Sequence, residues 1–203
     1  MPENAKQYTA RILGYVAGRE PLKQQQSTAR ELKKAIGSLT SQQMRWIPAP
    51  GKWSIAVILA HLADAEIVAG WRLRQVQSSN GVALQAYDQD AWAATLNYQN
   101  HPPLRSLEVF RVLREHNVAM LKRTPPALWQ NYSLHQERGR ESLAHIVHMF
   151  AGHDRNHLLQ VQDIARQIRE REKAKAKKSG VKATPTRAPA AAVSARRPAQ
   201  RSR

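Results

Sequence analysis

Two histidines stand four residues apart in the stretch Ala151-Gly152-His153-Asp154-Arg155-Asn156-His157-Leu158-Leu159-Gln160. Around them, apolar residues recur at steps of three and four at Leu143, Ile146, Val147, Phe150, Leu158, Val161, Ile164 and Ile168. This period predicts a long helix with one buried face. His153 and His157 fall on that face, one turn apart, where both imidazoles can bind the same metal ion.

A third histidine, His61, interrupts a second apolar stripe. The stripe follows a turn at Pro50-Gly51, and Ser54 is placed to cap the helix that begins there. Its members are Val57, Ile58, His61, Ala65 and Val68. A single histidine on such a stripe is more often a hydrogen-bonded core residue than a ligand. Beside the pair on the other helix, however, His61 becomes the candidate third ligand, with Asp64 one turn further on nearly the same side.

Two further helical regions are expected from the apolar pattern. Short pieces at residues 8–16 and 32–39 are predicted to form one broken helical arm, interrupted by Gly18 and Pro21, and a long helix is predicted at about residues 104–122. With the helices that carry the histidines, this makes four main helices.

The connections between these helices are long. Residues 77–103 are predicted to form a polar connection with a short helix at about 90–98, and residues 134–142 a loop whose Ser142 caps the last helix. No sustained period-two alternation indicates a strand. The predicted fold class is therefore all-α, a four-helix bundle with long crossover connections.

The chain is predicted to divide into a helical bundle domain at residues 1–168 and a basic tail at residues 169–203. The tail carries a net charge of +10 out of +17 for the whole chain. From about Lys173 it consists of Lys, Ala, Pro, Ser and Arg with almost no large apolar residue, so it cannot bury enough surface to offset the entropy lost on ordering. We expect a helical extension that passes into a disordered tail.

The sequence limits where in the cell the protein is expected and which atoms can bind a metal ion. The chain has no cysteine, so any metal must be held by nitrogen and oxygen atoms. The first residues carry no secretion signal pattern, and no apolar run is long enough to span a bilayer. We therefore expect a cytoplasmic protein without a membrane partner.

Several of these segments together resemble one known family. Pro50-Gly51-Lys52-Trp53-Ser54, His61-Leu62-Ala63-Asp64-Ala65-Glu66, Gly139 with Leu143, and His153 to Gln160 are similar to the DinB/YfiT-like superfamily. Its members are four-helix bundles predicted to be metalloenzymes, and the resemblance covers roughly residues 8–168. It implies the same fold and a homodimer.

The resemblance also implies a metal site. In that family one histidine of the second helix and two histidines four apart on the last helix hold a divalent ion. These positions are His61, His153 and His157 here. Zinc or nickel is the expected ion, with iron or manganese as alternatives. Asp64, Asp154, Arg155 and Gln160 are candidates for contacts around these ligands or with substrate.

Three protein ligands leave a coordination position open, whereas a closed structural zinc site uses four. An open site can activate water or a low-molecular-weight thiol. The expected function is thus that of a metal-dependent enzyme, hydrolase-like or S-transferase-like, acting on a small-molecule substrate and in the second case with a thiol cosubstrate. His148, also on the last helix, points away from His153 and His157 and is not expected to bind the metal.

A second function also fits this sequence. The bundle can be a non-catalytic metal-binding scaffold whose basic tail binds nucleic acid or acidic partners. Such binding would rest on charge alone, be weak and non-specific, and decrease with salt.

Overall fold

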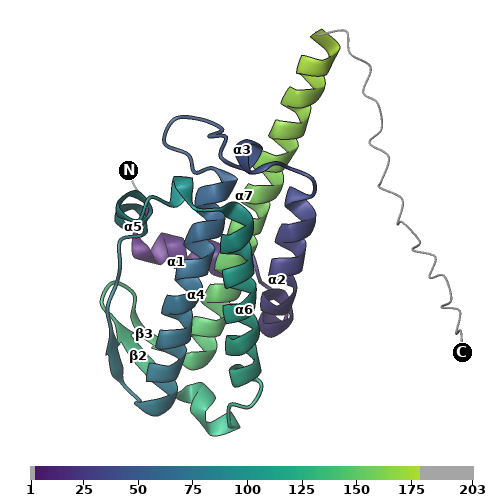
Figure 1. Cartoon of the computed structure of the whole chain (residues 1–203). Coiled ribbons are helices and arrows are strands. Elements are labelled where there is room, and N and C mark those ends of the chain that lie inside the picture. Colours follow the sequence, from purple (N-terminus) through teal and green to yellow (C-terminus); the bar gives the residue numbers. More distant parts are fainter. Residues whose placement is uncertain (1–2, 179–203) are drawn as a thin grey trace, which may run out of the picture.

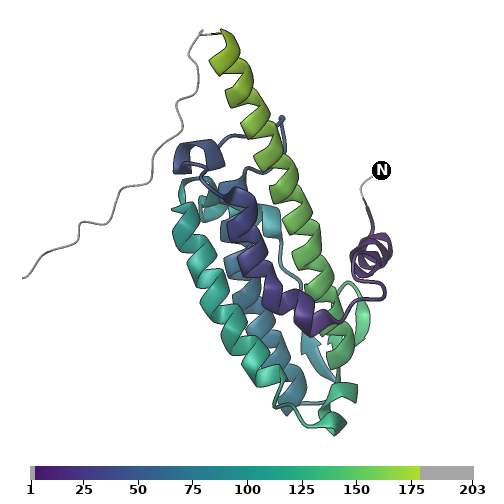
Figure 2. The ribbon, with the colours of Figure 1, turned by 90° about the vertical axis from the view of Figure 1, so that its right-hand side faces the viewer.

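The computed structural model describes residues 3–178, and four helices form its body (Figure 1, Figure 2). These are α2 (Pro21–Ile36), α4 (Ile55–Ser78), α6 (Pro103–Leu121) and α7 (Leu143–Lys178). α2 packs against α6 and α7, and α4 packs against the same two helices, so the four enclose one interior. The predicted four-helix bundle is confirmed.

The two helices that carry the histidines begin at the predicted caps. The Ser54 hydroxyl accepts a hydrogen bond from the backbone N–H of Val57 at 3.3 Å, at the start of α4. The Ser142 hydroxyl accepts one from the N–H of His145 at 3.1 Å, at the start of α7. Each cap satisfies a backbone donor that has no partner within its own helix.

The prediction of one broken helical arm at the N-terminus is wrong. α2 alone occupies a bundle position, and α1 (Ala5–Gly14) is a separate helix that lies against α7 (Figure 2). Gly18 adopts a left-handed φ of 71°, which ends the first segment. Pro21 is the first residue of α2, and the Glu20 carboxylate caps it by accepting from the N–H groups of Leu22 and Lys23.

The two long connections hold a small sheet that the sequence did not predict. β1 (Val82–Leu84) pairs in parallel with β2 (Tyr132–His135), which pairs antiparallel with β3 (Gly139–Ser142). The expected loop at 134–142 is therefore a hairpin, with Gly139 at a φ of 75°. Strands of three or four residues are too short to produce a sustained alternation, and β1 joins β2 from a distant part of the chain.

Shorter elements complete the connections. α3 (Ser41–Met44) precedes α4, and α5 (Gln89–Thr95) with the 3-10 turn η1 (Tyr98–Asn100) precedes α6. The turn η2 (Pro126–Gln130) leads from α6 to the hairpin. α5 corresponds to the predicted short helix in the 77–103 connection.

α7 extends well beyond the bundle and remains helical to Lys178 (Figure 1). We expected disorder from about Lys173, but residues 173–178 are helical because lysine and alanine are good helix formers and Lys175 pairs with Glu172 at 2.9 Å. The remainder of the predicted disordered tail lies outside the described residues. Within residues 3–178, none of the helices combines the length and the apolar character needed to cross a membrane.

The core consists of two main apolar clusters with a polar layer between them. One cluster includes Leu62 of α4 and Leu158 of α7, and the other includes Leu73 of α4 and Ile146 of α7. Glu66 of α4 and His153 and His157 of α7 lie on stretches that separate these clusters, and His61 lies among the α4 residues of the first cluster. Burying polar side chains inside the core lowers the stability of the fold unless they pair with one another or with a ligand.

Candidate metal centre

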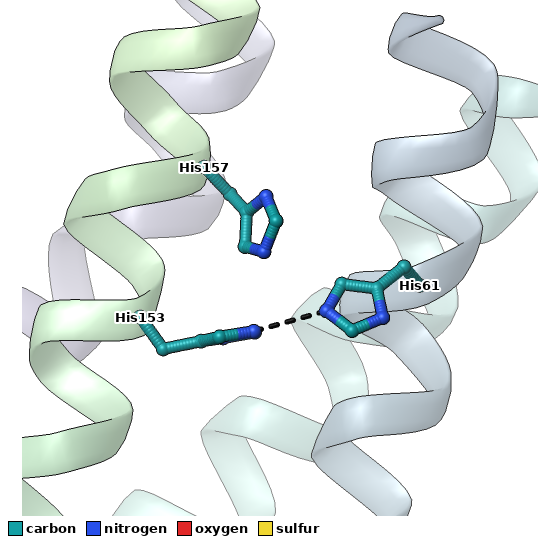
Figure 3. Close-up of side chains that lie close together, drawn as sticks. All are labelled: His61, His153 and His157. Atoms are coloured by element: carbon teal, nitrogen blue, oxygen red, sulfur yellow. Dashed lines mark hydrogen bonds between the residues drawn. The ribbon is translucent and has the colours of Figure 1, made fainter. Parts of the chain in front are cut away.

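Three imidazoles meet between α4 and α7. His61 comes from α4, and His153 and His157 come from successive turns of α7 (Figure 3). The contacting ring nitrogens all lie within 4.8 Å of one another. The Nε2 atoms of His61 and His153 are 2.9 Å apart. The three residues that sequence reasoning selected as ligands are thus brought together at one point in the interior.

Trp53 covers this cluster from the turn before α4. The centroid of its ring lies 5.0 Å from the centroid of the His61 ring. The Trp53 ring is nearly parallel to the His157 ring, and their centroids are 6.2 Å apart. Because Trp53 immediately precedes the Ser54 cap, the same turn that starts α4 also places the indole over the histidines. His61 and His157 are buried as a result, with 1% and 6% of their surfaces exposed, whereas His153 is only partly covered.

Gln160 fixes the orientation of His157. The Nδ1–H of His157 donates a hydrogen bond of 2.9 Å to Oε1 of Gln160, one turn further along α7. Since an amide oxygen only accepts, Nδ1 carries the proton, and the lone pair of the neutral ring is on Nε2. Figure 3 shows the free edge of this ring turned toward His61 and His153.

The environment keeps the three imidazoles neutral. Burial lowers the pKa of His157 to about 4. Burial, and after it the proximity of the other histidines, holds the pKa values of His61 and His153 well below the usual range. Neutral imidazoles with free lone pairs are the form that binds a metal ion, so the donor set fits a divalent ion.

The other site candidates have different partners. Asp64 accepts a hydrogen bond from the Tyr98 hydroxyl at 2.5 Å. Arg155 lies 3.9 Å from Glu31 in an ion pair at the surface. Asp154 is fully buried but faces Arg114 and Thr28. Of the four candidates, Gln160 is the one with a direct hydrogen bond to a histidine of the cluster.

A buried ion network next to the histidines links all four bundle helices. Arg114 of α6 donates to the carboxylates of Glu66 on α4 and Asp154 on α7. Thr28 of α2 donates to Asp154 at 3.0 Å, and Asn117 of α6 donates to Glu66 at 2.8 Å. Two carboxylates around one guanidinium satisfy most of the polar atoms, which makes this burial tolerable.

Sequence reasoning did not select Glu66 or Arg114, although a signal for Arg114 exists. It follows Phe110 and precedes Val118 by four residues each, so a charged residue occupies a core position of an apolar register. Such a position predicts a buried ion pair, but the partners become visible only in the folded structure.

A cavity of about 820 Å³ opens beside the cluster and has His153 in its wall. Part of its lining comes from the same faces of α4 and α7 that carry the histidines, with α1 and residues 86–89 on other sides. The partial exposure of His153 is explained by this cavity. A small molecule in the cavity can reach the side of the cluster that the protein leaves open.

Comparison with known proteins agrees with this geometry. The family model of the DinB superfamily matches residues 24–161, which include all three histidines. Two proteins of Oceanobacillus iheyensis, each named "putative metal-dependent hydrolase", are 25% identical to the chain. Their alignments span 137 and 143 residues, which are 68% and 70% of this chain and 79% and 82% of those proteins.

A solved structure shares the fold. YfiT from Bacillus subtilis superposes with a TM-score of 0.67 at 18% identity, over 82% of this chain and 90% of that one. That structure is described as "a probable metal-dependent hydrolase with an unusual four-helix bundle topology". The bundle, the buried cluster of three histidines and the match over most of the ordered body lead to one conclusion: the chain belongs to the DinB superfamily.

Proposed function

We propose that this protein is a metal-dependent hydrolase in which His61, His153 and His157 hold one divalent ion. The convergence of their three ring nitrogens at a point beside a cavity carries this proposal. The names of the relatives support hydrolysis. Zinc or nickel suits three imidazole ligands, and iron or manganese is also compatible with them.

Bound there, the ion would act as a Lewis acid and lower the pKa of a bound water molecule by many units, to about 7. The chain itself supplies the preorganisation. Gln160 holds His157 in the tautomer whose Nε2 is free, Trp53 shields the cluster from bulk water, and the Arg114 network fixes α4 and α7 relative to each other. A thiol in place of water would give the S-transferase variant of the same chemistry.

Elemental analysis of the full-length, tag-free protein tests this proposal. We expect about one divalent ion per chain and loss of that ion in His153→Ala. His148→Ala is the matched control, because His148 lies on the same helix but is exposed and bonds the carbonyl of Ala144. Absence of metal after supplementation, or full occupancy in His153→Ala, would refute the ligand set. Activity assays with esters and amides, with and without added thiols, then separate hydrolysis from thiol transfer.

The basic tail supports a second and compatible proposal, which is non-specific contact with nucleic acid. This rests on the charge of residues 169–203. Truncation after Lys178 leaves α7 intact and removes six of the tail's arginines and lysines. We expect the truncated protein to retain metal and to bind DNA more weakly at low salt. Equal DNA affinity of both forms would reject the role of the tail.

A further inference from the structure

The cavity beside the histidines extends along two facing helices. From α4 it is lined by Ala65 and Arg72, and from α7 by Ile146, Met149, Phe150 and His153. Arg72 follows His61 by eleven residues, which is about three turns and returns the side chain to nearly the same face of α4. The α-carbons are therefore separated by about 16 Å along the axis, and the arginine side chain leans back toward His61. The cavity joins the candidate metal centre to a buried guanidinium.

Arg72 is buried without a counterion. It is 5% exposed, and its hydrogen bond runs from Nη2 to the backbone carbonyl of Gln85 at 2.7 Å. Its Nε is buried and has no partner within residues 3–178, and no carboxylate of this part of the chain lies within ion-pair distance. The guanidinium carbon lies 5.8 Å from the centroid of the Tyr87 ring, which gives a cation–π contact but accepts no classical hydrogen bond. A guanidinium has five N–H donors and keeps its proton, and within residues 3–178 one of these donors, on Nη2, has an acceptor.

Two other arginines, the buried Arg114 and the half-buried Arg138, show what Arg72 lacks. Arg114 is held between the carboxylates of Glu66 and Asp154. Arg138, in the wall of the same cavity, forms a two-point pair with Glu141 at 2.6 and 3.0 Å. Burying a guanidinium without a carboxylate is costly, because the Gln85 carbonyl and the Tyr87 ring replace only part of the lost solvation. A negatively charged ligand group in the cavity would supply the missing partner.

A second unpaired donor lies close to Arg72. His135 of β2 pairs with Leu84, the residue before Gln85, so both side chains meet the end of β1. The Nδ1 of His135 accepts from the N–H of Glu137, which places the ring proton of the neutral imidazole on Nε2. That buried Nε2 has no partner among the described residues. His135 does not line the cavity, however, so Arg72 is the buried unsatisfied donor that belongs to its wall.

The charges around the cavity favour a single negative charge on the ligand. Its acidic residues are Glu3, Asp88, Glu137 and Glu141. Glu141 is paired with Arg138 and Glu3 with Arg11, while Asp88 caps α5 and Glu137 is exposed. The unpaired positive charge in the buried wall is that of Arg72, and acidic groups at the exposed rim disfavour a doubly charged ligand. A monocarboxylate fits better than a phosphate dianion.

We propose that Arg72 binds the carboxylate of an elongated small-molecule substrate whose other end reaches the histidine cluster. The cavity wall also has apolar and aromatic side chains, including Tyr8, Tyr87, Met149 and Phe150, which would contact the rest of such a molecule. This inference rests on the proposed function for its reacting end. The carboxylate subsite itself is independent of the metal.

Calorimetric binding of octanoate tests the subsite, with octanamide as the uncharged analogue and octyl phosphate as the doubly charged one. Each is titrated into the full-length protein, both metal-loaded and after chelation. In the chelated protein, where no ion can bind the carboxylate, we expect octanoate to bind at least tenfold more weakly to Arg72→Gln than to the unmodified chain. Octanamide should not distinguish the two proteins, and Arg72→Lys should recover part of the binding.

Arg74→Gln is the matched control, because Arg74 is exposed on the same helix and bonds Gly70 and Asn117 outside the cavity. Its octanoate affinity should be unchanged. Arg72→Gln should unfold at or above the temperature of the parent, since it removes an unpaired buried charge, and this rules out misfolding as the cause. Unchanged or absent octanoate binding, or tighter binding of octyl phosphate, would overturn the proposal. A protein that binds no metal but shows the Arg72-dependent octanoate binding would refute only the proposed hydrolase.

Discussion

At the scale of single residues, position on the helix decides which neighbours of a histidine contact it. Asp154 is adjacent to His153 in sequence, but successive residues point about 100° apart on a helix, and its carboxylate meets Arg114. Gln160 is three residues from His157 and lies on the same face, where it accepts the Nδ1 proton. The histidines were predictable because they lie on apolar stripes. The contacts of Asp154 were not, because they involve another helix.

Arg114→Met should destabilise the protein strongly. The change leaves Glu66 and Asp154 without their shared cation in a site where both are at most 2% exposed. Breaking a buried pair in this way costs about 3–5 kcal/mol of the free energy of unfolding, measured by urea denaturation. The control is Arg111→Met on the same helix, whose pairs with Glu108 and Glu115 are exposed, so its loss should change the free energy of unfolding much less. Equal effects of the two changes would contradict the role of Arg114.

The stability of the metal-free protein should fall in mild acid. His157 has a folded-state pKa of about 4, lowered from 6.5 by burial. Between these values the unfolded chain binds a proton that the folded chain does not, so the free energy of unfolding falls by about 1.4 kcal/mol per pH unit as pH decreases from 6.5 to 4. Above pH 6.5 this histidine adds no pH dependence. The pKa values of His61 and His153 are also lowered, so these residues make the free energy of unfolding fall more steeply with decreasing pH.

Urea unfolding of chelated protein at pH 7.5, 6 and 5 measures this dependence. His157→Gln should flatten it, whereas His148→Gln, at an exposed site, should leave it unchanged. A His157→Gln protein with the parental pH dependence would show that His157 is not the titrating group.

At the scale of elements, α1 depends on a single glycine in α7. A Cβ added at Gly152 would lie 2.2 Å from the carbonyl oxygen of Ile12, so the backbone of α1 touches α7 at this point. α1 precedes the region matched by the family model and lines the cavity through Tyr8. Gly152 thus allows a helix outside the family region to close one side of the cavity.

Gly152→Ala should displace α1 from α7. The overlap with backbone cannot be relieved by a rotamer change, so we expect a loss of about 1–3 kcal/mol despite the better helix propensity of alanine. Amide hydrogen exchange should accelerate in residues 5–14. Gly14→Ala is the control, since a Cβ there meets nothing within 4 Å. Unchanged exchange in α1 of Gly152→Ala would mean that the close contact is absent in solution.

Among the elements, the long helices could be predicted from the sequence and the small sheet could not. Helices such as α4, α6 and α7 were predictable because long apolar periods and capping serines mark them. The sheet was not, since its strands are short and burial in β2 opposes polarity: Ser133 and His135 are buried, whereas Leu134 is 50% exposed. The separation of α1 from α2 is not visible in the sequence, because Gly18 and Pro21 mark a break but not the direction in which the chain leaves it.

For the whole molecule, a buried ion network and two histidines of α7 lie between two apolar clusters, and His61 joins them from the edge of one cluster. The apolar clusters stabilise the fold, and the polar residues between and beside them include the proposed metal ligands. The fold class and the three histidines followed from periodicity and family resemblance. The Arg114 network, Arg72 and the cavity depend on contacts between distant segments, so they required the structure. The homodimer stays a prediction, which light scattering of the full-length protein can measure.

X-ray absorption spectroscopy of the zinc-loaded, full-length protein tests the central claim most directly. If His61, His153 and His157 hold the ion, the spectrum should show three imidazole nitrogens at about 2.0–2.1 Å, together with non-protein oxygen at the remaining position. His148→Ala should give the same spectrum, and His61→Ala should lose one imidazole contribution or the ion itself. A zinc environment of oxygen ligands alone, or one that is unchanged in His61→Ala, would contradict the assignment of this cluster as the metal site.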